Sequence, residues 1–318
     1  MKLRLAAKAS STWGQYKPAF RRFAEWCTLW NREFMPASSE TVELFLVDLA
    51  RKSSSPHPSS MASAAISAEH KIRNLTSPCS AQSTRDVLEG IRRKYGFAAT
   101  QREGLSENQL RQFIKIGLGG KIDFRKGTIL QWRTVWFEWF GFRAQARWGD
   151  TKLLTIGQFY FSDNHLEVFF AERKNDKKKR GHRVYISKSG SGECLVDFTR
   201  MYIARLGLLN ANEPHHLIMP KLTLVKGHYV AHQVFPRAET CRKEQSSILK
   251  SMELDPSKFG LHTPKVGGVR ALRDAGFEWR DISDKVGWAA NSQMPERYGK
   301  KSIVNNLKMD TEIWNKSK

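Results

Sequence analysis

Aromatic residues recur at helical spacing near the start of the chain. Between residues 9 and 31 the rings follow one another every three or four positions, which places them on one face of a helix. We expect most of these rings to pack in a core: Trp13, Tyr16, Phe20, Phe23, Trp26 and Trp30.

Three further helical patterns follow in the first hundred residues. SETVELFLVDLAR (39–51) predicts a helix with Ser39 as its N-cap, whereas SSSPHPSS (53–60) is typical of a loop. Small residues dominate 59–75 and would allow close approach to a neighbouring helix or to the backbone of a partner molecule. STRDVLEGIRRKYG then predicts a helix that ends near Gly96.

The pattern changes in the second part of the chain. LSENQLRQFIKIGL opens with a capping box, Ser106 followed by Gln109, and an aromatic helix is expected over 127–146. Three stretches then alternate as strands do: LLTIGQFYF, HLEVFFAE and HRVYIS. The remainder is expected to be mostly helical, with loops around 210–232 and 254–261.

These patterns predict a mainly α fold with a small antiparallel β-sheet and two domains. Residues 1–98 would form a four-helix domain, 99–105 a linker, and 106–318 a mixed domain with the sheet among its helices. The length of 318 residues allows each domain its own core.

The charge balance points to a polyanionic partner. Lys and Arg number 53 against 31 Asp and Glu, which gives a net charge of +22, and nucleic acid is the commonest partner for such an excess. A membrane surface is the alternative, but the sequence has neither a basic amphipathic helix nor an anchor. Candidate phosphate contacts lie between the N-terminal aromatic residues: Lys17, Arg21 and Arg22.

Other features exclude several classes of protein. The mean hydropathy is −0.51 and no window of about 20 apolar residues occurs, so we expect no membrane span, and the N-terminus predicts no secretory signal. The four cysteines are widely separated and lack zinc-site spacing. We expect reduced thiols in an intracellular protein, with no metal and no cofactor.

A strongly basic segment separates two of the predicted strands. ERKNDKKKRGHRV (172–184) carries seven Lys or Arg against two acids. It could be a solvated hairpin turn, a nuclear-localisation signal, or a basic finger that reaches a DNA groove. The last interpretation adds four candidate DNA contacts: Lys177, Lys178, Lys179 and Arg180.

Several polar residues follow one another in a set order through the second domain. Arg147 precedes Asp150 by three positions, and HTPKVGG places His262 three residues before a lysine and a Gly-Gly pair. Trp288 and Tyr298 come after the next helix. Each residue alone is a weak signal, because an Arg near an Asp is usually an ordinary ion pair and a lone His or Tyr is usually structural.

Taken in order, the set resembles the tyrosine recombinases of the phage integrase family over roughly residues 10–305. The family motifs match these positions: Arg147 with Asp150, Lys174 in the hairpin, His262 with Lys265, Trp288 and Tyr298. The C-terminal part of the pattern is the specific one. Arg143 and Lys177 are nearby competitors for the first arginine and the hairpin lysine.

The resemblance implies a fold, a reaction and partners. The first domain would be a SAM-like core-binding domain, and the second the α+β catalytic domain. Double-stranded DNA would be cleaved and rejoined through a 3′-phosphotyrosine without a metal, with dimers on one site and tetramers on two. A C-terminal segment, 302–318, would dock on a neighbouring protomer, and the protein would act in a bacterial nucleoid or a eukaryotic nucleus.

The resemblance also implies a role for each matched residue. Tyr298 would be the nucleophile and Lys174 the general acid, while Arg147 and Trp288 hold the phosphate. His262 would serve in proton transfer, and Asp150 would orient the residues that touch the phosphate.

Lys265 departs from the arginine that most family members have at this position. Lysine keeps the charge but loses the bidentate fork of arginine, and loss of one oriented donor typically lowers a rate by about 10²–10³. We therefore expect normal DNA binding with slow cleavage, as in a degenerate copy or a chain altered to trap a complex. The alternatives are a recombinase-derived DNA-binding protein and a type IB topoisomerase-like enzyme.

Overall fold

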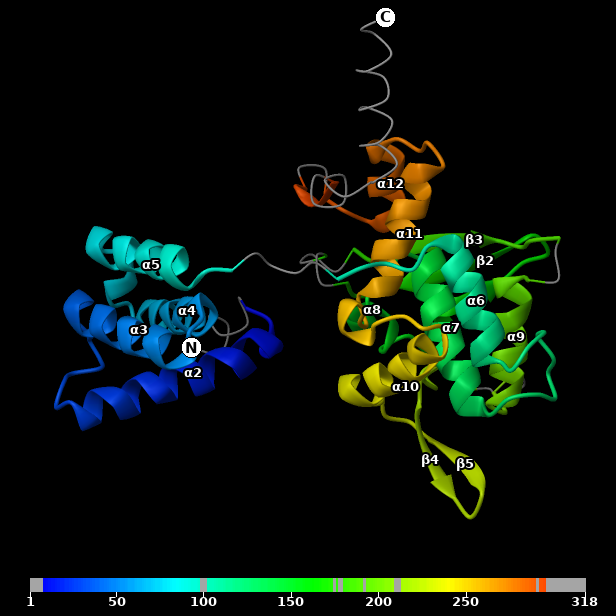
Figure 1. Cartoon of the computed structure of the whole chain (residues 1–318), viewed down its shortest axis with the longest axis horizontal. Coiled ribbons are helices and arrows are strands. Elements are labelled where there is room, and N and C mark those ends of the chain that lie inside the picture. The colour runs from blue at the N-terminus through cyan, green and yellow to red at the C-terminus, as the bar shows by residue number, and fades with distance from the viewer. Residues whose placement is uncertain are drawn as a thin grey trace, which may run out of the picture. The chain divides into compact units, whose positions relative to one another are not determined.

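The fold is mainly helical with small antiparallel sheets, as the sequence predicts. The computed structural model describes residues 8–97, 102–173, 176, 180–190, 193–208, 213–289 and 292–295. The chain divides into two compact units, residues 1–100 and 101–318, which Figure 1 distinguishes by colour, blue to cyan for the first and green to orange for the second.

The first unit is a helical domain. Its elements are α2 (Ser10–Leu29), α3 (Ser39–Ser53), α4 (Pro56–Ile72), the 3-10 turn η1 (Pro78–Ser80) and α5 (Gln82–Tyr95). Phe23 and Trp13 of α2 are buried as expected, whereas Trp30, just beyond the helix, is 61% exposed. Most of the aromatic face therefore packs in the core, and its C-terminal end does not.

Two local predictions in this unit are wrong. The N-cap of α3 is Ser38, not Ser39, because the Ser38 hydroxyl accepts a hydrogen bond of 3.1 Å from the backbone amide of Thr41. The expected loop at 53–60 is largely helical, because Ser55 caps α4 and proline is compatible with the first helical turn.

The small residues of α4 permit close helix packing. Ala62 and Ala65 are fully buried or nearly so, and the Ser59 hydroxyl donates to the backbone carbonyl of Leu46 on α3 at 2.9 Å. Of the two expected uses of these residues, the contact with neighbouring helices is the one that the structure shows.

The second unit combines helices with two small sheets. Its helices are α6 (Glu107–Gly117), α7 (Ile129–Arg143), α8 (Trp148–Thr151), α9 (Leu195–Arg205), α10 (Ala238–Ser251), α11 (Thr263–Asp274) and α12 (Trp279–Val286). Its strands are β1 (Phe159–Phe161), β2 (His165–Phe170), β3 (His182–Ser187), β4 (Lys221–Val225) and β5 (His228–His232). Two 3-10 turns complete it, η2 (Ile156–Gln158) and η3 (Pro256–Lys258).

Helix α7 forms the centre of this unit and is buried on nearly all sides. Its rings stack on those of α9, with Trp132 and Phe198 centroids 4.6 Å apart. The α7 helix also buries a charge, because Arg133 is 1% exposed and binds both carboxylate oxygens of Glu244 at 2.6 Å. The long aromatic pattern is therefore a core pattern.

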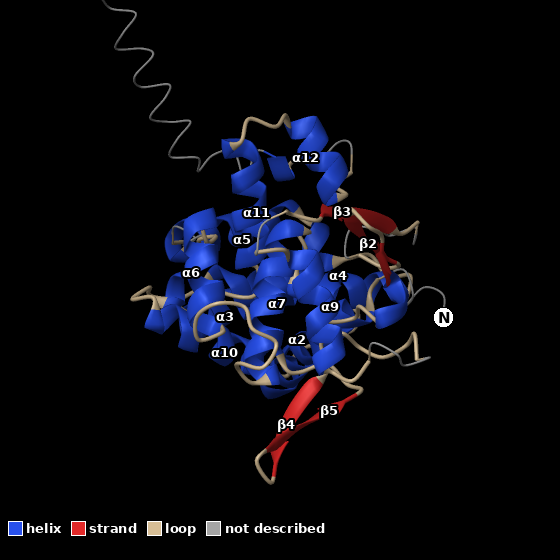
Figure 2. Cartoon of the chain, turned by 90° about the vertical axis from the view of Figure 1, so that its right-hand side faces the viewer, coloured by secondary structure: helices blue, strands red, loops and turns tan. Residues whose placement is uncertain are grey.

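The sheets confirm the strand predictions HLEVFFAE and HRVYIS and the last three residues of LLTIGQFYF, whose middle is the 3-10 turn η2, and they add a hairpin. β1, β2 and β3 pair antiparallel in that order, and the alternating residues of β2 and β3 are buried. Within the region expected to be loop, β4 and β5 pair antiparallel. Lys226 and Gly227 connect them with φ of 47° and 84°, the geometry of a tight hairpin turn. The hairpin extends away from the helices of its unit in Figures 1 and 2.

Among the described residues, no helix combines the length and the apolar character needed to cross a membrane.

Candidate active site

The Gly-Gly pair after Lys265 allows α11 to lie directly against α7. A Cβ added at Gly268 would overlap the carbonyl oxygen of Phe142, and one at Gly267 would overlap the carbonyl oxygen of Leu105. On the α7 side, a Cβ at Gly141 would lie 2.7 Å from a side-chain carbon of Pro264. Glycine is therefore required for this packing, which fixes Lys265 relative to the end of α7.

The chain turns sharply after α7 and places Arg147 and Asp150 close to this contact. Gln145 adopts a left-handed φ of 46°. Its side-chain amide Nε2 donates to the backbone carbonyls of Phe142 and Arg143 at 2.8 and 3.1 Å. Arg147 then precedes the short helix α8. Its backbone amide donates to the buried Asp150 carboxylate at 3.2 Å, so the carboxylate holds the backbone of Arg147 in position.

Lys265 and Trp288 meet in the interior. The Lys265 Nζ lies 5.5 Å from the centroid of the Trp288 ring, within the distance of a cation–π contact when the amine is protonated, and only 1% of Lys265 is exposed. Trp288 packs with Val266, Val269, Ile282 and Val286 of α11 and α12 in a small separate core.

A second arginine, Arg173, joins the cluster from the segment between β2 and β3. Its Nη1 donates to the carbonyl of Val286 at 2.8 Å, and its Nε lies 3.9 Å from the Asp150 carboxylate. The guanidinium also covers the Phe170 ring at 4.4 Å. The Arg173 side chain is 6% exposed, and its buried Nη2 has no hydrogen-bond partner among the described residues.

The cluster has more positive than negative charge. The charges that act on Lys265 are those of Arg147 and Arg173 and one carboxylate, that of Asp150. Burial, together with the charges of Arg147 and Arg173, lowers the pKa of Lys265 to about 6, while Asp150 acts in the opposite direction. Burial, with a smaller contribution from Arg147, likewise lowers the pKa of Arg173, and Asp150 opposes it. A site of this kind is suited to an anion, because an anion offsets both the repulsion and the burial of charge.

The β2–β3 segment is tied to the end of α12. His182 donates through Nε2 to the carbonyl of Lys285 at 3.0 Å, next to the Val286 carbonyl that Arg173 occupies. Burial lowers the pKa of His182. Gly287 follows with φ of +70°, and a Cβ there would lie 3.1 Å from the His182 ring. The side chains of Arg173 and His182 thus bind the C-terminal carbonyls of α12. These bonds hold the end of α12 in place, and Trp288 follows two residues later.

The other predicted residues divide into described and undescribed ones. His262 is exposed and precedes the first residue of α11. Arg180 is exposed, as are Lys17, Arg21 and Arg22 on α2 in the first unit. Further predicted residues lie outside the described residues: Lys174, Lys177, Lys178, Lys179 and Tyr298. The segment 302–318 lies outside them as well.

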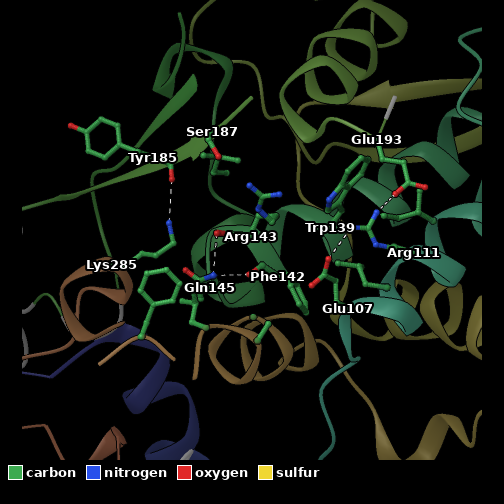
Figure 3. A pocket seen from close by; sticks show the side chains of 17 residues that line it. Glu107, Arg111, Trp139, Phe142, Arg143, Gln145, Tyr185, Ser187, Glu193 and Lys285 are labelled. Carbon is green, nitrogen blue, oxygen red and sulfur yellow. Dashed lines mark hydrogen bonds and ion pairs between the residues drawn. The ribbon is translucent and has the colours of Figure 1, made fainter. Parts of the chain in front are cut away.

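Arg143, the competitor of Arg147, lies in a different place. It lines a pocket of about 420 Å³ between α6, α7, β3, α11 and α12, and Figure 3 shows it together with Tyr185 and Lys285. None of the residues predicted to be catalytic lines this pocket. Of the two arginines, Arg147 is therefore the one whose charge acts on Lys265 and Arg173.

Arg173 and His182 were not among the residues that the sequence singled out. Both lie in the basic segment 172–184, where seven basic residues look alike in sequence. Only their positions in the sequence could have indicated a role: Arg173 directly precedes Lys174, and His182 begins the strand β3. Which of the basic side chains turns inward depends on contacts with α12, more than 100 residues later.

The fold resembles solved structures of site-specific recombinases, although the sequence matches no family model. No family model matches the chain, and no curated protein matches its sequence. The XerH site-specific recombinase, solved bound to a palindromic difH substrate as a post-cleavage complex, matches with a TM-score of 0.61 and 12% identity over 87% of this chain and 72% of that one. The Tn1549 transposon integrase, solved in complex with transposon right end DNA, matches with a TM-score of 0.54 and 13% identity over 86% of this chain and 84% of that one. The chain therefore has the fold of these site-specific recombinases, the tyrosine recombinase fold that its C-terminal motifs resemble.

Proposed function

We propose that the protein is a site-specific DNA recombinase or integrase that cleaves and rejoins DNA through a 3′-phosphotyrosine at Tyr298. The observation that carries the proposal is a cluster in which the buried side chains of Arg173 and Lys265 lie with the half-buried Arg147 near one carboxylate, that of Asp150, in a fold whose solved relatives are recombinases. A phosphodiester in the transition state develops negative charge, and fixed cations in a dry site stabilise it.

The proposed chemistry uses side chains alone. The Tyr298 phenol loses its proton to His262 and attacks the scissile phosphorus, which forms the tyrosyl–phosphate bond as the bond to the 5′-oxygen breaks. Lys174 gives a proton to that leaving oxygen. Arg147 and Trp288 hold the phosphate, and Asp150 holds Arg147. Attack by the 5′-hydroxyl of another strand reverses these steps and rejoins the DNA.

The proposed partner is double-stranded DNA, bound by both units. Basic side chains would contact its phosphates in addition to the active site. They are the exposed Lys17, Arg21, Arg22 and Arg180, together with Lys177, Lys178 and Lys179. Because each phosphate contact releases counterions, the affinity for a duplex should fall steeply with salt. Filter binding between about 50 and 200 mM salt tests this, and a flat response would contradict a phosphate-contacting surface.

Assembly and location follow from the same proposal. Two protomers would bind one DNA site and four would bring two sites together, with the segment 302–318 docked on a neighbour. Such an enzyme acts where the DNA is, in a nucleoid or a nucleus.

Lys265 is proposed to slow the reaction. Lysine at this position has one compact charge in place of the planar fork of arginine, and the burial that lowers its pKa to about 6 leaves the free site with a neutral amine at pH 7. We expect Lys265→Arg to raise the rate of strand cleavage with little change in DNA affinity. An unchanged rate would show that residue 265 does not hold the phosphate.

The deciding experiment is covalent trapping. Nicked duplexes with a randomised central sequence are incubated with the protein, denatured, and scored for DNA covalently attached to protein. We expect an adduct with the unaltered chain and none with Tyr298→Phe. DNA binding without any adduct would instead identify a DNA-binding protein derived from a recombinase, and relaxation of a plasmid that carries no selected site would identify a topoisomerase.

A further inference from the structure

Arg173 has the features of a ligand-binding group that the matched motifs do not include. Its guanidinium is almost completely buried, yet only part of its donor set is satisfied: Nη1 binds the carbonyl of Val286, and Nε faces Asp150 at 3.9 Å. Nη2 is buried with no partner among the described residues. A buried N–H without an acceptor is costly, so the site is built for an acceptor that the described chain does not supply.

The surroundings of Arg173 connect it to every described member of the cluster. Asp150 lies between Arg173 and the backbone of Arg147. On the other side, the Val286 carbonyl that receives Arg173 is two residues before Trp288, whose ring contacts the Lys265 ammonium. The Arg173 guanidinium therefore belongs to the same cluster as Lys265, the lysine at the position where most family members have arginine.

We propose that Arg173 binds the scissile phosphate and supplies the oriented guanidinium that Lys265 lacks. The inference rests on the proposed strand-cleavage function and assigns one more catalytic residue to it. A guanidinium has five donors in a planar array. With Nη1 held by Val286 and Nε directed toward Asp150, the orientation of the remaining edge is fixed before a phosphate binds, which is the property that makes a donor effective in a transition state.

The position of Arg173 explains how the site works with lysine at 265. Lys265 alone would contribute an ammonium buried at 1% exposure, without a fork. Arg173 approaches from a different element, the segment between β2 and β3, and brings the missing planar group to the same cluster. A loss at one chain position is thus partly offset by an arginine about 90 residues earlier in the sequence.

The test is a rescue experiment on the trapping reaction. Four proteins are compared on nicked duplexes selected with the unaltered chain: unaltered, Arg173→Lys, Lys265→Arg, and the double variant. We expect Arg173→Lys to slow adduct formation by about 10²–10³ with duplex affinity changed less than about threefold. In the double variant the new arginine at 265 replaces the lost guanidinium, so Lys265→Arg should raise the rate of the Arg173→Lys protein at least about tenfold more than it raises the rate of the unaltered chain.

A matched control separates catalysis from folding. Arg183 is an arginine of the adjoining strand that pairs with Glu167 at the surface, and Arg183→Lys should leave the rate unchanged. Thermal melts establish that each variant is folded. The discriminating outcome is a gain from Lys265→Arg that is larger in the Arg173→Lys background than in the unaltered chain, because Lys265→Arg cannot restore the bond between Arg173 and Val286.

Two results would overturn the inference while leaving the proposed function intact. One is an Arg173→Lys protein that forms the adduct at the unaltered rate. The other is a slow Arg173→Lys protein that Lys265→Arg accelerates no more than it accelerates the unaltered chain, which would make Arg173 a positioning residue for the hairpin. Absence of any adduct with the unaltered chain would overturn the proposed function and this inference together.

Discussion

Burial of Lys265 should make the free energy of unfolding depend on pH. The side chain is 1% exposed and faces two arginines and one carboxylate, those of Arg147, Arg173 and Asp150. Burial, reinforced by the two arginines, lowers its pKa from 10.5 to about 6. The perturbation that tests this is Lys265→Met, which keeps a long side chain but removes the titrating group.

The sign follows from proton binding in the two states. Between pH 6 and pH 10.5 the unfolded chain holds a proton on Lys265 that the folded chain does not, so this group makes stability rise with pH. One pH unit corresponds to about 1.4 kcal/mol of unfolding free energy. From pH 7 to pH 9 the penalty of burying Lys265 should therefore decrease by about 3 kcal/mol.

The assay is urea denaturation of the unaltered and Lys265→Met proteins at pH 7, 8 and 9. We expect the variant to be the more stable protein at pH 7 by several kcal/mol, about 5 from the same relation, with the difference shrinking steadily toward pH 9. Groups that titrate in both proteins cancel in the difference. Lys250→Met removes an exposed charge from α10 as a control, and its difference from the unaltered protein should be small at every pH. A Lys265→Met difference that is the same at all three pH values would refute the buried, neutral lysine.

Two further pairs of substitutions, each a test and its matched control, probe the ion pair of Arg133 and the contact of α11 with α7. Glu244→Gln leaves the buried Arg133 guanidinium uncompensated and should lower the free energy of unfolding by about 3–5 kcal/mol. Glu239→Gln, which breaks an exposed pair on the same helix, should change it by less than about 1 kcal/mol. Gly268→Ala forces a Cβ into the Phe142 carbonyl oxygen and should lower the unfolding free energy by about 1–3 kcal/mol or more, whereas Gly90→Ala, where a Cβ meets nothing, should raise it by about 0.5–1 kcal/mol. Urea titrations at pH 7 measure all four, and equal effects of Gly268→Ala and Gly90→Ala would contradict the close contact of α11 with α7.

Local signals in the sequence predicted many of the elements. The capping box at Ser106 and Gln109 is present with both of its hydrogen bonds, because such a motif depends on residues three positions apart. The errors arose where a local signal had two outcomes. Pro56 began a helix rather than extending a loop, and Gly227 closed a hairpin in a region without strong strand alternation.

The candidate site was predictable as a set of residue types but not as an arrangement. The order of Arg147, His262, Lys265 and Trp288 along the chain identified the resemblance. The structure brings Arg147, Lys265 and Trp288 into one cluster with Asp150 and leaves His262 exposed at the start of α11. The roles of these residues, and of Lys174 and Tyr298, remain proposals that the trapping experiments test.

The sequence by itself determined the helical periodicity, the basic charge and the order of the motif residues, because each of these is a property of residues close together in the chain. Only the tertiary structure decided which basic side chains are buried together. Arg173 enters the cluster because the carbonyl of Val286 and the carboxylate of Asp150 lie on either side of it. Lys265 is buried because Gly267 and Gly268 let α11 approach α7 to backbone contact. Charge, burial and pairing depend on distances in space, and those distances arise from packing between elements far apart in the sequence.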